Sequence, residues 1–133
     1  MQVQPYLNFD GRCEEALQFY KSALGAEVTA LMRCKDAPDP GMIKPGLEDK
    51  VLHSSFRVGD STIMASDGYC QGKPEFRGVS LTIIVPEEAD AKRLFAALSE
   101  GGEVRMPLAK TFFSPLFGMV ADRFGVSWMI IVR

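Results

Sequence analysis

The second half of this chain of 133 residues repeats the pattern of elements found in the first half. Residues 6–9 precede a helical pattern that closes at Gly25, and residues 79–82 precede a helical pattern that closes at Gly101. Two copies are too few for a solenoid, and a spacing of roughly 60 to 75 residues is too long for a solenoid repeat. The repeat instead predicts one α+β domain over residues 1–133. In it, two βαβββ modules, about 1–70 and 77–133, form an eight-stranded sheet with a concave pocket.

The composition excludes several classes of protein. Hydrophobic residues make up 47% of the chain and charged residues 24%, which is typical of a globular protein. The net charge is −2 and no basic run is present, so a nucleic-acid partner is not expected. The longest apolar runs are too short to span a membrane, and the first residues do not resemble a secretory signal. We therefore expect a cytoplasmic protein without a membrane partner.

The three cysteines give no sign of a disulfide or a metal-binding motif. Cys13, Cys34 and Cys70 are widely spaced and form no CxxC pair. Cys13 falls on the apolar stripe of the first helix, where a small hydrophobic residue is needed. No base lies near any of them in the sequence, so a nucleophilic role is not expected.

Two amphipathic helices and several strands follow from the apolar periodicity. The first helix has its inner stripe at Cys13, Ala16, Leu17, Tyr20 and Leu24, and the second at Ala91, Leu94, Phe95 and Leu98. Strands are expected at residues 3–9, 26–35, 50–58, 61–67, 79–85, 103–109, 115–121 and 126–132. Residues 36–46, rich in proline and glycine, predict a long loop.

A two-residue turn at Gly59-Asp60 predicts which side chains share a face of the hairpin. With this turn Val58 lies opposite Ser61, and directly opposed residues point to the same side. One face then carries His53, Ser55, Arg57, Thr62, Met64 and Ser66, and we assign it to the pocket. The other carries Leu52, Ser54, Phe56, Val58, Ile63, Ala65 and Asp67 and is expected to lie under a helix.

The same alternation assigns the faces of the remaining strands. Val3, Pro5, Leu7 and Phe9 form the apolar face of the first strand, opposite Gln4 and Tyr6. In the second half, Val79, Leu81, Ile83, Val126, Trp128 and Ile130 are expected under a helix. Ser80, Thr82, Ile84, Ser127, Met129 and Ile131 are left for the pocket, whose wall is predicted to be mildly polar and rich in methionine.

Three stretches of the sequence resemble a known superfamily. They are residues 5–7 with the helix that ends in residues 19–25, residues 64–67, and the closing residues 122–129. Together they resemble the glyoxalase/bleomycin resistance/dioxygenase superfamily, or vicinal oxygen chelate proteins. The closest likeness is to its PhnB-like branch, often labelled as a 3-demethylubiquinone-9 3-methyltransferase domain. The resemblance covers essentially the whole chain and implies two βαβββ modules in a homodimer.

The resemblance also indicates where a metal would be held. Metal-using members place ligands on the first, fourth, fifth and eighth strands, which on this chain implies Gln4, Met64 or Ser66, Ser80 and Met129. A divalent metal prefers imidazole or carboxylate donors, and these side chains are an amide, hydroxyls and thioethers. No metal or other cofactor is therefore predicted. Methyl transfer is not expected either, because no glycine-rich turn for a nucleotide-like cofactor is present.

His53, the only histidine, is the one candidate catalytic residue, as a general base or ligand donor. A histidine satisfied by Ser66 or by the backbone is the alternative. The candidate ligand-binding residues are Gln4, Tyr6, Met64, Ser66, Ser80, Thr82, Phe112 and Met129. Phe112, Phe113 and Phe117 are expected to wall an apolar ligand site or a dimer seam, and Asp67 and Asp122 to cap turns.

Three functions remain open from the sequence. The leading hypothesis is a metal-free pocket that binds a small, largely apolar or aromatic molecule. The second is a glyoxalase, lyase or dioxygenase with a divalent metal held by His53, Gln4 and a carboxylate from Glu75 or from the partner chain. The third is a non-catalytic dimeric scaffold. Whether the protein is an enzyme is left undecided by the sequence.

Overall fold

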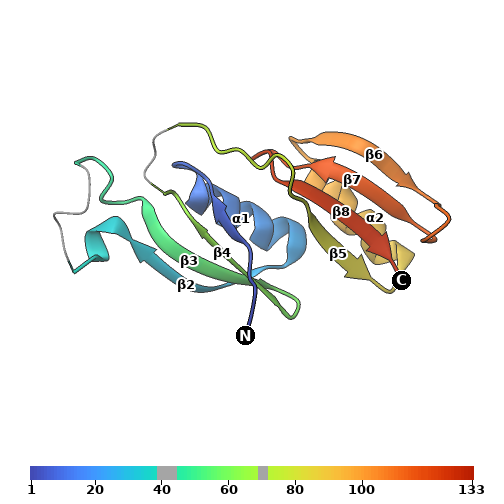
Figure 1. Cartoon of the computed structure of the whole chain (residues 1–133), viewed down its shortest axis with the longest axis horizontal. Helices are drawn as coiled ribbons and strands as arrows, with labels where there is room; N and C mark the ends of the chain where they lie inside the picture. Colours follow the sequence, from blue (N-terminus) through green and yellow to red (C-terminus); the bar gives the residue numbers. More distant parts are fainter. Residues whose placement is uncertain (39–44, 69–71) are drawn as a thin grey trace. The chain divides into compact units, whose positions relative to one another are not determined.

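The computed structural model describes residues 1–38, 45–68 and 72–133, and it divides into two compact units (Figure 1). The first unit spans Met1–Pro74 and the second Glu75–Arg133. Among the described residues, each unit contains one long α-helix and four strands, and these eight strands lie in two four-stranded sheets. This confirms the predicted α+β architecture of two βαβββ modules. Neither described helix is long and apolar enough to cross a membrane.

The first unit follows the order β1, α1, β2, β3, β4. Its elements are β1 (Tyr6–Asn8), α1 (Cys13–Leu24), β2 (Glu27–Arg33), a short 3₁₀ turn η1 (Cys34–Asp36), β3 (Val51–Val58) and β4 (Ser61–Ser66). The sheet order is β1-β4-β3-β2, with β1 and β4 parallel and the other pairs antiparallel. The predicted loop begins at this 3₁₀ turn, and its residues 39–44 lie outside the described part of the chain.

The second unit has the same topology. Its elements are β5 (Leu81–Val85), α2 (Glu88–Ser99), β6 (Glu103–Ala109), β7 (Phe117–Ala121) and β8 (Ser127–Val132). The sheet order β5-β8-β7-β6 corresponds strand by strand to the order β1-β4-β3-β2 of the first unit. The repeat read from the sequence therefore corresponds to a repeat of strand order.

Each helix covers one face of the sheet in its own unit. Helix α1 buries Cys13, Ala16, Leu17, Tyr20 and Ala23, and α2 buries Ala91, Leu94, Phe95 and Leu98. Both stripes match the predicted periodicity with one exception. Ala23 is buried, whereas Leu24, which was expected to be buried, is partly exposed. Gly25 ends α1 in the left-handed conformation, with φ of 65°, which glycine adopts without steric cost.

The hairpin register predicted from the Gly59-Asp60 turn is confirmed. Val58 pairs with Ser61, Phe56 with Ile63 and Ser54 with Ala65. Phe56, Ile63, Ser54 and Ala65 are buried on the side of α1, as the alternation requires. We call the opposite side of each sheet, away from the helix of the same unit, its open face.

Three predicted positions are wrong because strands are shorter or less regular than the alternation assumed. Leu52 is 40% exposed, since the pairing of β2 with β3 shifts there and Val51 is the buried residue. Strand β1 begins only at Tyr6, and Val3 is 95% exposed. Strand β5 begins at Leu81, so Val79 lies ahead of it and is exposed.

Candidate functional site

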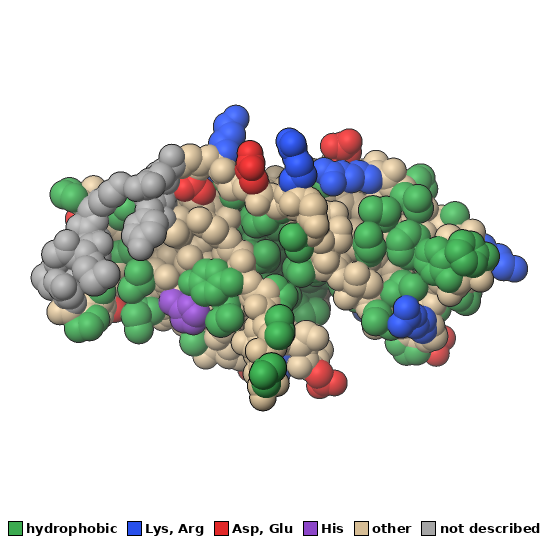
Figure 2. All heavy atoms as spheres, in the orientation of Figure 1, with side chains coloured by type: hydrophobic (Ala, Val, Ile, Leu, Met, Phe, Trp, Pro, Cys, Tyr) green, Lys and Arg blue, Asp and Glu red, His purple; other side chains and the backbone are tan. Residues whose placement is uncertain are grey.

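Tyr6 and His53 form a hydrogen-bonded pair on the first unit's sheet. The phenolic oxygen of Tyr6 lies 3.2 Å from Nδ1 of His53, and the ring centroids are 5.7 Å apart. Tyr6 is 49% exposed and His53 is partly exposed. Figure 2 shows the histidine next to hydrophobic side chains at the surface. The pair thus presents a polar contact within a mainly apolar surface.

The sheet register explains why these two side chains meet. Tyr6 is the Cα partner of Met64 in the parallel β1–β4 pair, and Met64 is the partner of Ser55 on β3. His53 lies two residues before Ser55 on β3, hence on the same face and one row away. Tyr6 therefore reaches His53 diagonally across β4, a contact within the range of long aromatic side chains.

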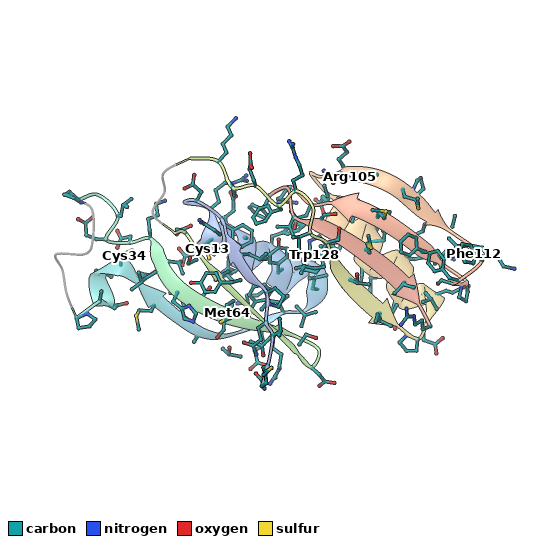
Figure 3. The ribbon with its side chains drawn as sticks, in the orientation of Figure 1. Cys13, Cys34, Met64, Arg105, Phe112 and Trp128 are labelled. Carbon is teal, nitrogen blue, oxygen red and sulfur yellow. The ribbon has the colours of Figure 1, made fainter. Side chains whose placement is uncertain are left out.

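Two methionines flank this pair on the open face. Met32 is the Cα partner of His53 across β2 and β3 and is 43% exposed. Met64 on β4, labelled in Figure 3, lies between Tyr6 and Ser55. Thioethers are polarisable and pack against aromatic rings in several rotamers. The open face thus combines two rings, two thioethers and few charges, with Arg57 in the ion pair to Glu27 at its edge.

The hydrogen bond determines what His53 can offer to a ligand. When the Tyr6 hydroxyl donates to Nδ1, the neutral ring carries its proton on Nε2 and donates from that atom. When Nδ1 carries the proton and donates to Tyr6, Nε2 is an acceptor. In the described part of the chain, Nε2 has no hydrogen-bond partner. Either tautomer leaves one polar atom available for a ligand or for proton transfer.

The second unit has a more apolar open face. Thr82 pairs with Met129, Met129 with Met119, and Met119 with Met106, so four strands contribute one row. The neighbouring row contains Ile84, Ile131 and Phe117. Gly118 lies on the other face, where an added Cβ would meet Phe95 of α2. The open face of this unit therefore carries a row of thioethers, of which Met129 was predicted from the sequence.

Three phenylalanines meet where β6 connects to β7. The rings of Phe112 and Phe113 are 5.2 Å apart and those of Phe113 and Phe117 are 5.0 Å apart, each pair edge-to-face. Phe112 is fully exposed and lies at the end of the sheet in Figure 3. The predicted aromatic cluster forms, but Phe112 is its outermost member.

The remaining predicted pocket residues have local partners. The Gln4 amide donates to the side chain of Gln2, and the Ser66 hydroxyl accepts from the backbone N–H of Gly68. The hydroxyls of Ser80 and Ser127 are 2.9 Å apart. Sequence reasoning missed Met32, Met106 and Met119, whose facing depends on irregular strand pairs next to them.

The buried carboxylates of Asp67 and Asp122 accept hydrogen bonds from backbone N–H groups and so serve as caps, as the sequence predicted. Asp67 Oδ1 accepts hydrogen bonds from the N–H groups of Gly11 and Cys13, and Oδ2 from that of Val51. It thereby caps the start of α1, for which Arg12 provides no side-chain cap. Asp122 Oδ1 accepts from Phe124 and Val126, which closes the turn between β7 and β8.

The described cysteines lie outside both open faces. Cys13 is fully buried and Cys34 is 6% exposed, while Cys70 falls outside the described residues. Burial raises the pKa of the Cys13 thiol to about 12, partly offset by its hydrogen bond with the Ser54 hydroxyl. Burial also raises the pKa of Cys34. The raised pKa keeps both thiols protonated near neutral pH, which disfavours a nucleophilic role for Cys13 and Cys34.

The donors for a divalent metal are sparse. Within residues 1–38, 45–68 and 72–133, no three His, Cys, Asp or Glu side chains come together as a potential metal site. His53 has a tyrosine and a methionine as neighbours, which are not the usual ligands of Zn²⁺ or Mg²⁺. The residues around His53 therefore fit a hydrogen-bonding role better than divalent metal coordination.

Comparisons with known proteins place the chain in a family. The family model described as 3-demethylubiquinone-9 3-methyltransferase matches residues 1–131. Protein YjdN of Escherichia coli is 33% identical over 99% of this chain and 95% of its own length. The crystal structure of protein PA1353 from Pseudomonas aeruginosa is 40% identical, with a TM-score of 0.89, and covers 100% of this chain and 98% of its own.

Two further structures agree. A putative 3-demethylubiquinone-9 3-methyltransferase, PhnB protein, from Bacillus cereus is 28% identical with a TM-score of 0.83, and all of each chain is covered. The fosfomycin resistance protein FosX from Mesorhizobium loti shares the fold at 12% identity and a TM-score of 0.66, over 100% of this chain and 91% of its own. The chain therefore belongs to the 3-demethylubiquinone-9 3-methyltransferase family.

Proposed function

We propose that this protein is a cytoplasmic homodimer that binds a small, largely apolar or aromatic molecule without a resident divalent metal. The observation that carries the proposal is the Tyr6–His53 pair on the open face of the first unit's sheet. A ligand site of this kind needs apolar surface together with a few polar groups that fix orientation. Tyr6 and His53 supply the polar groups, and Met32 and Met64 supply adaptable apolar surface.

The chemistry of the pair defines the ligand class. A flat aromatic ring packs favourably against thioethers and against the faces of Tyr6 and His53. One hydrogen-bonding group on that ring, such as a carbonyl, phenol or carboxylate oxygen, would meet Nε2 of His53. The nearest described cation on this face, Arg57, is already paired with Glu27. A neutral or singly charged aromatic compound is therefore favoured over a phosphate-rich one.

Binding of simple aromatic probes tests this proposal. Phenol, benzoate and 1,4-benzoquinone would be titrated into uniformly ¹⁵N-labelled protein that also carries ¹³C-methyl methionine. We expect at least one probe to shift the His53 ring nitrogens together with the Met64 methyl. The variant His53→Ala should bind that probe at least tenfold more weakly than the parent chain. Lys73→Ala, at an exposed position, should bind it with unchanged affinity. Probes that shift neither group, or bind His53→Ala equally well, would reject the proposal.

The alternative hypothesis of a metal-dependent enzyme is tested by measuring the metal content of the purified protein. Elemental analysis of protein purified without chelators would be compared between the parent chain and His53→Ala. We expect less than one-tenth of a divalent metal per chain in both. One metal per chain that disappears in His53→Ala would favour a metal-dependent lyase or dioxygenase instead. Sedimentation equilibrium tests the dimer, for which two chains per particle are expected.

A further inference from the structure

Three methionines lie side by side on the open face of the second unit. Met106 on β6 is the Cα partner of Met119 on β7, which is the partner of Met129 on β8. Directly opposed residues in a sheet share a face and have Cβ atoms about 4.5 to 5.5 Å apart. The three thioethers therefore form one row across adjacent strands, and Thr82 on β5 extends it.

The row is open to small solutes. Met106 is 44% exposed, and Met119 and Met129 are partly exposed. Each methionine has three rotatable bonds, so the two outer sulfurs can lean toward the middle one without a change in the backbone. Figure 2 shows hydrophobic side chains gathered over the strands of this sheet. A single ion seated above Met119 would thus be within reach of all three sulfurs.

The donor set determines which ion fits. Thioethers are soft, neutral ligands that select Cu(I) over hard ions such as Mg²⁺ or Ca²⁺. The charged residues near the row on β6 are Glu103 and Arg105, both exposed and of opposite sign. We propose that Met106, Met119 and Met129 bind one soft monovalent cation, Cu(I), for which Ag(I) is a redox-stable analogue. This site is independent of the proposed function, because it uses the other sheet and none of its residues.

A thioether site differs from thiolate or imidazole sites in its response to pH. Thiolate and histidine ligands must lose a proton before they bind a metal, so their affinity falls as the solution becomes acidic. Methionine sulfur does not titrate in this range. The affinity of the methionine row for Ag(I) is therefore expected to change less than twofold between pH 5 and pH 7.5.

An NMR titration tests the site on the full chain. The chain has seven methionines, and ¹³C-methyl labelling reports on each of them. Cys34→Ser and Cys70→Ser remove two competing thiols, while Cys13 is buried with a raised pKa. We expect one equivalent of Ag(I) to shift the methyl signals of Met106, Met119 and Met129 and to leave those of Met32 and Met64 in place.

Two variants of similar volume complete the test. Met119→Leu should reduce Ag(I) affinity at least tenfold, and Met64→Leu, on the other sheet, should not. Should Met119→Leu fail to fold, Met106→Leu at the exposed end of the row replaces it. The proposal is overturned if the three methyls do not move, if the methyls of Met32 and Met64 shift in their place, or if both variants retain the parent affinity.

Discussion

Asp122 and Trp128 are joined by a buried hydrogen bond, in which the indole Nε1 donates to Oδ2 at 2.9 Å. The other carboxylate oxygen accepts from the backbone N–H groups of Phe124 and Val126 at 2.9 and 3.1 Å. Both side chains are at most 3% exposed. One carboxylate thus holds the β7–β8 turn closed and fixes the orientation of the only tryptophan in the sequence.

Replacing Asp122 by alanine should therefore destabilise the fold strongly. Three buried N–H groups would lose their acceptor, and we expect the free energy of unfolding to fall by about 3 to 5 kcal/mol. Urea unfolding followed by Trp128 fluorescence measures this loss. The exposed carboxylate of Glu75 provides the matched control, because Glu75→Ala should change the same free energy by less than about 0.5 kcal/mol. Equal losses in the two variants would contradict the role given to Asp122.

Gly118 on β7 is a second position where the structure allows little change. A Cβ added there would lie 2.8 Å from Cε2 of Phe95 and 3.0 Å from Cδ2 of Leu108. Gly118→Ala should therefore lower the free energy of unfolding by about 1 to 3 kcal/mol, through overpacking under α2. Gly72→Ala is the control, since a Cβ at Gly72 meets nothing within 4 Å. A Gly118→Ala protein as stable as the control would show that Phe95 can move aside.

The helices and the β3–β4 hairpin were predictable, because they depend on interactions between residues that are close together in the sequence. The helix stripes and the Val58–Ser61 register follow from apolar periodicity and from a two-residue turn. The alternation failed at Leu52, where a shift in the pairing of β2 and β3 reverses the facing. No residue type at that point signals the irregularity, so sequence alone could not locate it.

The candidate sites depended on contacts between distant segments. The hairpin register predicted from the Gly59-Asp60 turn placed His53 and Met64 on one face, and Tyr6 was among the expected pocket residues. Their hydrogen bond needed the parallel pairing of Tyr6 with Met64, which joins two strands far apart in the sequence. The row of Met106, Met119 and Met129 likewise needed the β6–β7 register, which contains two shifts. The sequence identified members of the sites, and the pairing of strands brought them together.

Cys13 should be almost inert toward alkylating reagents in the folded protein. Its pKa of about 12, raised by burial, leaves on the order of one thiolate in ten thousand at pH 8. Iodoacetamide labelling at pH 8 with peptide mass spectrometry should therefore find Cys13 unmodified after an hour, and fully modified in 8 M urea. Rapid labelling of Cys13 in the folded chain would show that α1 opens readily from its sheet.

Tyr6→Phe should change the tautomer balance of His53 without unfolding the chain. The substitution removes the hydroxyl that lies 3.2 Å from Nδ1 and keeps the ring. We expect the ¹⁵N chemical shifts of Nδ1 and Nε2 to move toward those of a free imidazole, in which the Nε2–H form is only modestly preferred. Thr62→Val, at a partly exposed position on β4, is the control and should leave both shifts in place. Unchanged nitrogen shifts in Tyr6→Phe would mean that the hydrogen bond does not form in solution.

The ion pair between Glu14 on α1 and Arg33 at the end of β2 should make stability depend on acid pH. A hydrogen bond from Arg33, reinforced by its charge, lowers the pKa of Glu14 below its ordinary value of 4.5. A lowered folded pKa contributes stability that is present above 4.5 and is lost as the pH falls through the lower folded value. Glu14→Gln should therefore unfold at a lower urea concentration than the parent chain at pH 7.

The difference should vanish in acid. Once the pH falls below the lowered pKa of folded Glu14, the parent side chain is protonated and resembles glutamine, so the two urea midpoints are expected to converge. The side chains of Arg33 and Glu14 are 27% and 52% exposed, so solvent screens the pair, and the shift at pH 7 is expected to be small and to shrink in 1 M NaCl. Glu75→Gln, exposed in the second unit, should show no midpoint shift at either pH. A Glu14→Gln midpoint that stays below the parent value in acid would mean that packing against α1, and not the charge of Glu14, accounts for the loss.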